Sequence, residues 1–186
     1  MLWIELLNSE WRDWKGDGHL TDKLMDLEWR QKFAAQLGWG ELPYPSEDQV
    51  EKLVHLRSEL HNWARHLQQN SGLTLDAIER LNGWMAAGGY RKRLMKREER
   101  LVLTEETLLK NWDTLTAAFA DSFAQFTAEG EPSRIKFCDN PNCLWVFLDE
   151  TRNRTKRYCD DKLCGNLMKV RRFRAKIKTG AKPDEQ

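Results

Sequence analysis

Two short stretches, CDNPNC at residues 138–143 and CDDKLC at residues 159–164, decide how the C-terminal quarter of the chain folds. Zinc takes four ligands at tetrahedral angles, about 2.3 Å from the metal, and paired cysteines on two separated turns supply them. Asn-Pro-Asn is a turn sequence that bends the first pair back toward one ion. The stretches therefore predict one structural zinc ion, held by Cys138, Cys143, Cys159 and Cys164.

Three other uses of the four cysteines compete with a structural metal site. Two disulfides suit an exported protein, but residues 1–5 contain no basic region followed by a long apolar stretch. We therefore expect a cytoplasmic protein. The cytoplasm is reducing, and reducing conditions favour metal-binding thiols over disulfides. Four unrelated core cysteines are the second alternative. A catalytic zinc is the third, and it needs an open coordination position that four cysteines do not leave.

The residues between and after the two pairs predict a β-hairpin followed by a helix. Residues 144–148 (LWVFL) are a strong strand sequence, and residues 156–158 are the expected returning strand. Asp160 or Asp161 then caps a helix that runs to about Lys178. We expect the apolar arc of this helix to pack on the hairpin or on the rest of the protein; it consists of Leu163, Leu167, Val170, Phe173 and Ile177.

Charge is distributed unevenly along the chain, although the net charge is only +1. Residues 1–132 contain 16 lysines and arginines against 22 acidic residues, whereas residues 133–178 contain 13 against 5. A basic end on an acidic body favours a polyanion-binding surface over the alternative, a solvated charged face. The expected nucleic-acid-binding residues are Arg152, Arg154, Lys156, Arg157, Lys169, Arg171, Arg172, Arg174, Lys176 and Lys178.

The first 132 residues predict a helical domain. Ser46 and Gln49 form a capping-box sequence at the start of one helix, and Thr74 caps another. A further helix is expected to begin near residues 21–22. The segment Leu2–Leu7 is short for a stable helix and predicts a strand.

Two other features of this domain bear on its function. Residues 91–95 and 101–104 flank a charged turn and predict a short β-hairpin. The polar, glycine-punctuated loop after Leu7 suggests a ligand pocket at Asn8, Trp11 and Asp13, whereas most of the nine tryptophans are expected to serve core packing.

The chain therefore predicts a mainly α fold with three parts. Residues 1–132 are a helical, ligand-sensing or regulatory domain with a short β-hairpin, and Gly130-Glu131-Pro132 ends it. Residues 133–178 are a small zinc finger, a β-hairpin followed by a basic helix, and residues 179–186 are a flexible tail. No apolar run approaches the roughly 20 residues that a membrane helix needs.

The stretch 138–176 resembles the CGNR zinc-finger family of bacterial proteins. The shared features are a Trp-x-Phe-x-Asp strand at Trp145, Phe147 and Asp149, an Arg-Asn turn at Arg152-Asn153, and the Cys-Gly-Asn that opens a basic helix at Cys164. The signature arginine of the family is Leu167 in this chain. The remainder more weakly resembles the helical half that accompanies this finger in proteins described as stress-induced transcription regulators.

The resemblance implies a DNA-binding transcriptional regulator whose helical domain senses a ligand. We expect the protein to be non-enzymatic, because the sequence contains no nucleophile–base arrangement, no phosphate-binding loop and no open metal site. We expect the helical domain to bind a small-molecule effector or a second copy of the chain as a homodimer. Two alternatives use the same residues. One is an RNA-binding protein in which exposed aromatic side chains stack on bases. The other is a protein-interaction module in which zinc shapes a docking surface.

Overall fold

The computed structural model describes residues 1–69, 72–98 and 100–178. The described residues form two compact units, one within Met1–Ser9 and Lys23–Ser133 and one within Glu10–Asp22 and residues 134–178. Residues 10–22 belong to the unit that contains the cysteines, although the expected helical domain, residues 1–132, includes them. The expected flexible tail, residues 179–186, lies outside the described residues.

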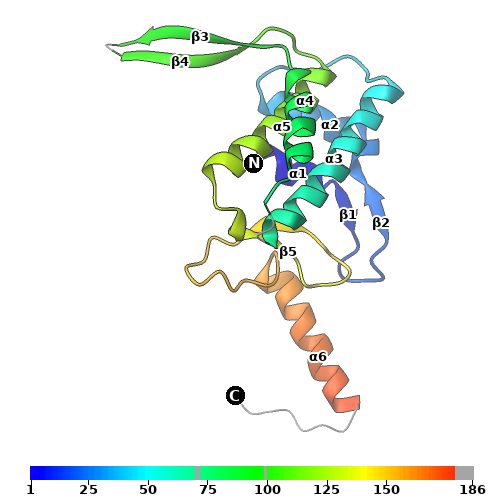
Figure 1. Cartoon of the computed structure of the whole chain (residues 1–186). Helices are drawn as coiled ribbons and strands as arrows, with labels where there is room; N and C mark the ends of the chain where they lie inside the picture. The colour runs from blue at the N-terminus through cyan, green and yellow to red at the C-terminus, as the bar shows by residue number, and fades with distance from the viewer. Residues whose placement is uncertain (70–71, 99, 179–186) are drawn as a thin grey trace. The chain divides into compact units, whose positions relative to one another are not determined.

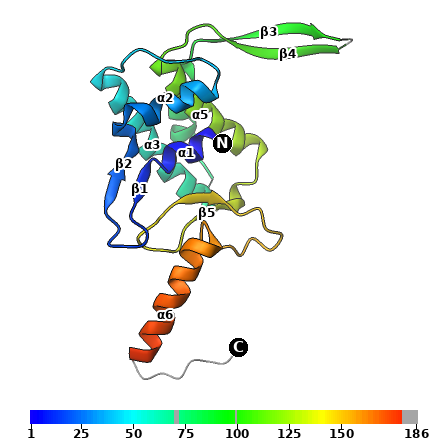
Figure 2. The same ribbon diagram turned by 180° about the vertical axis from the view of Figure 1, so that it is seen from behind.

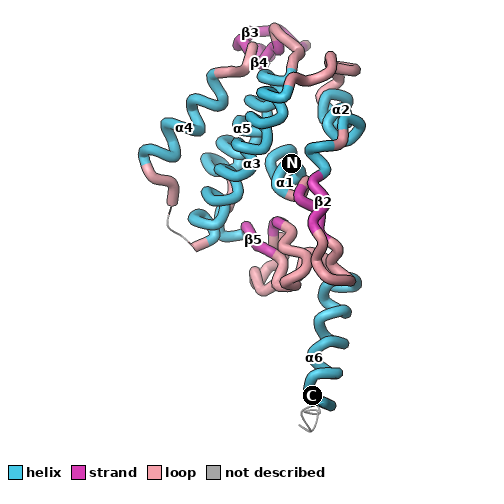
Figure 3. The backbone as a smooth tube through the Cα atoms, turned by 90° about the vertical axis from the view of Figure 1, so that its right-hand side faces the viewer, coloured by secondary structure: helices cyan, strands magenta, loops and turns pink. Residues whose placement is uncertain are grey.

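The first unit is a helical body (Figures 1 and 2). Its helices are α1 (Leu2–Leu7), a 3-10 turn (Lys23–Met25), α2 (Leu27–Gln36), α3 (Glu47–Gln68), α4 (Leu75–Ala86) and α5 (Trp112–Glu129). Helix α5 packs against α1, α3 and α4 (Figure 3). Its side chains Leu115, Phe119 and Phe123 are at most 1% exposed, so α5 is the centre of the core.

The segment Leu2–Leu7 is the helix α1, and the expected strand there is wrong. Trp3, Leu6 and Leu7 are its buried residues, at the i, i+3 and i+4 spacing of one helix face. The Trp3 ring lies 5.2 Å from the Phe123 ring in an edge-to-face arrangement. Packing against α5 thus stabilises a helix that is too short to form alone.

The predicted helix starts are confirmed for α3 and α4 and corrected for α2. Ser46 and Gln49 form the complete capping box of α3, and the Thr74 side chain accepts a hydrogen bond from Ala77 N. Residues 20–22, in contrast, are a strand, and α2 begins at Leu27 with Asp26 as its cap. The Asp26 carboxylate accepts the Glu28 N–H at 2.9 Å, which satisfies one of the free amides at that end.

The predicted hairpin of the first unit is confirmed as the strands β3 (Tyr90–Arg97) and β4 (Arg100–Thr107). They are antiparallel and pair Tyr90 with Thr107 at one end and Arg97 with Arg100 at the other. The hairpin projects away from the helices of its unit (Figures 1 and 2).

The second unit consists of two small sheets and a helix. Its elements are β1 (Glu10–Arg12), β2 (Leu20–Asp22), β5 (Ile135–Phe137), β6 (Val146–Leu148), a π-helical turn (Asp161–Gly165) and α6 (Asn166–Lys178). Strand β1 pairs with β2, and β5 pairs with β6, both antiparallel. No described helix in the chain is long and apolar enough to cross a membrane.

The expected hairpin before the basic helix is present, but the strand that pairs with β6 is not the expected one. Strand β6 pairs with β5, which precedes the first cysteine pair, and residues 156–158 form no strand. The main chain of the expected strand is bonded elsewhere: Lys156 N donates to Asp149 Oδ2 at 2.7 Å, and Arg157 O accepts from Asp139 N at 2.9 Å. The N–H of Lys156 is therefore bonded to a side chain and the C=O of Arg157 to a loop, so neither group is available for strand pairing.

Candidate metal centre

The four cysteines reach one point from two loops of the second unit. Cys138 directly follows β5, and its N–H donates to Trp145 O at 2.8 Å, which extends the β5–β6 ladder by one residue. Cys143 closes the Asn-Pro-Asn turn by donating its N–H to Asn140 O at 2.8 Å. Cys159 precedes the π-helical turn, and Cys164 lies within it.

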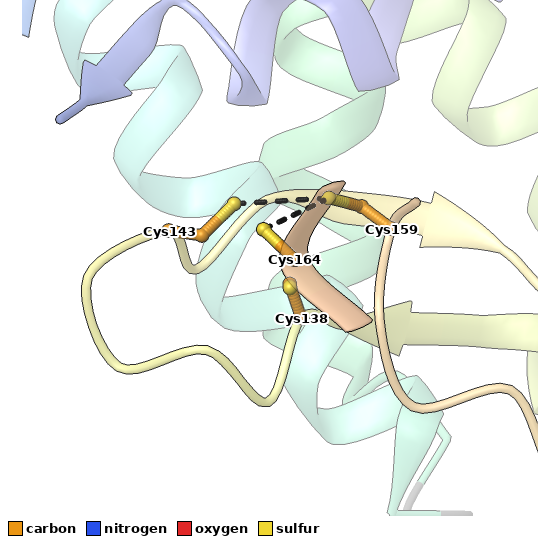
Figure 4. Close-up of side chains that lie close together, drawn as sticks. All are labelled: Cys138, Cys143, Cys159 and Cys164. Carbon is orange, nitrogen blue, oxygen red and sulfur yellow. Dashed lines mark hydrogen bonds between the residues drawn. The ribbon is translucent and has the colours of Figure 1, made fainter. Parts of the chain in front are cut away.

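The geometry of the four sulfur atoms fits a tetrahedral metal ion. All four Sγ atoms lie within 4.8 Å of one another, and the side chains point toward a common centre (Figure 4). The Sγ atoms of Cys143 and Cys159 are 3.7 Å apart, and those of Cys159 and Cys164 are 3.9 Å apart. Zinc–sulfur bonds of about 2.3 Å at tetrahedral angles place neighbouring sulfurs about 3.8 Å apart.

Disulfide bonds do not fit this cluster, because their sulfur atoms lie about 2.05 Å apart. All four cysteines are free thiols. Cys138, Cys143 and Cys164 are buried, and Cys159 is half-buried. Tyr158 is buried in the same cluster, and Trp14, Phe147 and Met168 pack against it. The thiols therefore lie in an apolar shell that limits the access of water to the metal position.

The hydrogen bonding among the thiols also favours a cation at the centre of the cluster. Hydrogen bonds from the thiols of Cys143 and Cys159 lower the pKa of Cys138. The same hydrogen bonding to Cys138, with burial, raises the pKa of both Cys143 and Cys159. One thiolate is thus stabilised at the expense of its neighbours. Four thiolates can coexist here only when a metal ion neutralises them.

Asn140 supports the site from within the first loop. It is fully buried, and its Nδ2 group donates both to Cys164 Sγ at 3.3 Å and to Trp14 O at 3.1 Å. Its Oδ1 accepts the N–H of Asn142 at 3.2 Å, which shapes the turn. The sequence marked this segment only as a turn, and no local pattern indicated the hydrogen bond to a ligand sulfur.

The hairpin of β1 and β2 is the second support of the metal loops. Its connecting loop is held by Asn142 Nδ2, which donates to Gly16 O at 2.6 Å, and by Arg171, which donates to Lys15 O at 2.9 Å. Asp13 shapes this loop, because its Oδ1 accepts the N–H groups of Lys15 and Gly16. These hydrogen bonds explain why residues far apart in sequence form one unit with the cysteines.

The three residues of the expected ligand pocket, Asn8, Trp11 and Asp13, are divided between the two units. Asn8 belongs to the first unit, while Trp11 and Asp13 belong to the second. Trp11 does line a hollow of about 210 Å³, together with Trp14, Trp145 and Leu163 and next to three of the cysteines. Asp13 serves the loop instead of that hollow.

The loop after β6 brings part of the predicted basic set together with α6. Arg152, Lys156, Arg157 and Lys169 line one hollow of about 470 Å³, and Asp161 is the only acidic residue among the described residues that line it. Asp149, which is fully buried, organises the loop by accepting the N–H groups of Thr151 at 3.0 Å and Lys156 at 2.7 Å. Burial alone would raise the pKa of Asp149, but the hydrogen bonds from Thr151 and Lys156 lower it overall.

The other predicted basic residues have separate positions. Arg171 is occupied by the β1–β2 loop, and Arg172 donates to the Tyr158 hydroxyl. Arg154, Arg174 and Lys176 are exposed. The side chain of Lys178, at the end of α6, lies outside the described part of the chain.

The expected packing of the apolar arc on α6 is not observed. Leu163, Val170, Phe173 and Ile177 are all exposed, and Phe173 retains 52% of its accessible surface. Leu167, at the position of the family's arginine, is half-buried. Helix α6 is instead joined to its unit through Met168, Arg171 and Arg172.

A β-hairpin, four converging thiols and a following helix define a small zinc finger with four cysteine ligands. Residues 134–176 match the family model of the CGNR zinc finger, and the resemblance of this segment is therefore confirmed. The curated proteins compared with the chain include no match to it. The four thiols close the coordination sphere of one zinc ion, whose role is structural.

Proposed function

We propose that the chain is a non-enzymatic DNA-binding regulator whose zinc finger holds a phosphate-binding surface. One observation carries the proposal: Arg152, Lys156, Arg157 and Lys169 line a single hollow beside the metal loops. A concave surface with four cations and one acid raises the local potential more than the same charges scattered over a convex surface. Thr151 and Thr155 also line it and supply hydroxyl groups suited to phosphate oxygens.

The four cations of the hollow differ in how firmly they are held. Lys156 is half-buried, and its Nζ lies 5.5 Å from the centre of the Phe147 ring. Arg157 forms an ion pair with Asp139, whose carboxylate lies 2.6 Å from its Nε. Arg152 and Lys169 are exposed. In this proposal zinc binding and phosphate binding are coupled, because zinc fixes the loop after β6, which carries Arg152, Lys156 and Arg157, and the helix α6, which carries Lys169.

Salt-dependent binding of the zinc-loaded full chain to duplex DNA tests the proposal. The double variant Lys156→Ala/Lys169→Ala should bind labelled duplex more weakly, and the slope of log affinity against log salt should fall by ~0.9 for each phosphate that is no longer neutralised. Lys110→Ala is a matched control, since Lys110 is an exposed lysine of the other unit. Absence of salt-dependent binding to any duplex would overturn the proposal.

Competition separates DNA binding from the two alternatives. Structured RNA that displaces duplex DNA, and binds more tightly, would assign the surface to RNA. A protein-interaction module would keep its partner after charge reversal of Arg152, Lys156 and Lys169. Bound-fragment sequencing with metal-analysed protein would then give the preferred sequence.

The helical unit is the proposed effector domain, and its candidate site is a hollow of about 580 Å³. Met25, Arg30, Tyr44 and His55 are among its lining residues. Tyr44 is 78% exposed, so a ligand there would bury an aromatic side chain that the unit leaves in water. A ligand-induced shift in the melting temperature that Tyr44→Ala abolishes would support this part of the proposal. A shift that persists in Tyr44→Ala would contradict it.

A further inference from the structure

The β3–β4 hairpin is a two-stranded sheet whose strands pair only with each other among the described strands. Every β3 residue is half-exposed or exposed. Isolated two-stranded sheets are marginal in water and usually need a third strand or a packed face. An open edge of such a sheet also offers unpaired N–H and C=O groups to another strand.

One face of the hairpin carries an exposed apolar cluster. Leu94 lies directly opposite Leu103 in the register, and Leu101 is on the same face because it is two residues from Leu103. The exposed fractions of Leu94, Leu101 and Leu103 are 61%, 70% and 61%. These three leucines are a surface that the described chain does not cover.

The charge pattern along β4 favours pairing with the β4 strand of a second copy of the chain. Arg100 stands at the start of the strand and Glu106 near its end, three residues on either side of Leu103. If two β4 strands pair antiparallel about Leu103, Arg100 of each copy lies opposite Glu106 of the other. Opposite charges in such cross-strand positions stabilise a sheet.

Strand β3 lacks this complementarity. Arg91, Lys92 and Arg93 lie near its start, and Lys96 and Arg97 lie at its end, without an acidic residue between them. Antiparallel pairing of two β3 strands would therefore bring like charges together, which destabilises a sheet. The edge of β4 is thus the edge suited to a second copy of the chain.

Ion pairs with Arg91 and Arg93 hold the side chain of Glu106 on the face of the hairpin that also carries Arg100. Its Oε2 lies 2.8 Å from Arg91 Nη2, and its Oε1 lies 3.6 Å from Arg93 Nη1. These cations lower the pKa of Glu106, with the hydrogen bond from Arg91 as the largest cause. Residues 100 and 106 lie on one face because they are six positions apart, and side chains of a strand alternate between its two faces.

We propose that two copies of the chain join through their β4 edges into one four-stranded antiparallel sheet. In this arrangement Leu94 and Leu103 of one copy and Leu103 and Leu94 of the second copy form a continuous row across the sheet. The Arg100–Glu106 pairs lie on the opposite face, one on each side of the two-fold axis. Such an interface is isologous, because both copies use the same strand. This inference stands apart from the proposed DNA binding and needs no nucleic acid.

Sedimentation velocity of the full, zinc-loaded chain over a concentration series tests the interface. Wild type should dimerise, and Leu103→Lys should weaken self-association about tenfold or more, because it places two cations at the two-fold axis. Leu75→Lys is the matched control, since Leu75 is an 82% exposed leucine on α4. Circular dichroism and zinc content check that each variant folds.

A charge-complementation experiment makes the test specific to this register. Arg100→Glu and Glu106→Arg each place like charges opposite each other in a homodimer, so each variant alone should dimerise weakly. An equal mixture of the two variants restores two opposite-charge pairs and should form heterodimers. A monomeric wild type would overturn the inference. So would a dimer insensitive to Leu103→Lys and Arg100→Glu, or a mixture that dimerises no better than its components.

Discussion

Asn140 donates a hydrogen bond to a metal-ligand sulfur, with its Nδ2 3.3 Å from Cys164 Sγ, while being fully buried. N–H groups aimed at a thiolate stabilise its negative charge and orient the ligand. The same Nδ2 reaches Trp14 O at 3.1 Å, so one amide links the metal site to the β1–β2 loop. Asn140 is therefore a positioning residue of the zinc finger.

Replacing this amide should loosen the zinc ion. Asn140→Asp puts a carboxylate beside the thiolates in place of a donor, and zinc should transfer to a chromogenic chelator 10- to 100-fold more readily, the usual range for outer-shell substitutions. Asn142→Asp is the control, because the Asn142 side chain donates to Gly16 O rather than to a ligand sulfur. Equal zinc release from both variants would show that loop shape alone matters.

Zinc affinity should fall as the pH falls. The thiols of Cys143 and Cys159 have raised pKa values in the metal-free protein, so they are protonated at neutral pH and zinc must displace their protons. Lower pH adds competing protons and weakens binding, while higher pH strengthens it. Chelator competition between about pH 6 and pH 8 should therefore give a slope of log affinity against pH of at least about two. A flat profile would contradict the cluster of protonated thiols.

The buried carboxylate of Asp149 should contribute to stability except in acid. Because its pKa is below the ordinary value of 3.8, the ionised side chain stabilises the folded state at pH values above about 4, and this contribution is lost as the pH falls through the lowered pKa. Asp149→Asn should cost ~2–4 kcal/mol of unfolding free energy at neutral pH, because the N–H groups of Thr151 and Lys156 and the Thr151 hydroxyl lose a charged acceptor. Denaturant unfolding at several pH values checks this, and the two proteins should converge in acid.

Arg171 and Arg174 stand on the same helix but should have different roles. Arg171 holds the loop at Lys15 O, so Arg171→Ala should speed tryptic cleavage after Lys15. Arg174 is exposed, and Arg174→Ala should leave this cleavage unchanged while lowering DNA affinity, because one phosphate fewer is neutralised. If both variants were cleaved at the wild-type rate, the loop would not depend on Arg171.

The sequence predicted the features that depend on neighbouring residues. The metal cluster of the paired cysteines, the capping box at Ser46 and the β3–β4 hairpin each depend on short stretches of sequence, and the structure contains all three. The α1 helix was mistaken for a strand because its stability comes from Trp3 packing on Phe123, a contact between distant residues. Local propensity contains no information on such a contact.

The sequence did not predict that residues 10–22 belong to the second unit, for a related reason. Trp14 O and Gly16 O meet the side chains of Asn140 and Asn142 across 126 residues of sequence. Main-chain carbonyls are present at every residue, so nothing in residues 10–22 marks them as acceptors for the metal loops. The tryptophans of that segment were the visible signal, and they pointed equally well to a ligand pocket or to a core.

The split composition of this unit sets the order in which a growing chain can fold. Of the second unit, Glu10–Asp22 leaves the ribosome first, the whole of Lys23–Ser133 from the first unit follows, and the cysteines and Arg171 come last. The helical body has most of its core residues available before any zinc ligand is made. A chain interrupted before Cys164 cannot complete its metal site, and Trp14 stays without the cluster that covers it. Such a fragment leaves the aromatic side chains of the β1–β2 hairpin exposed to water, and we expect chaperones and proteases to act on it.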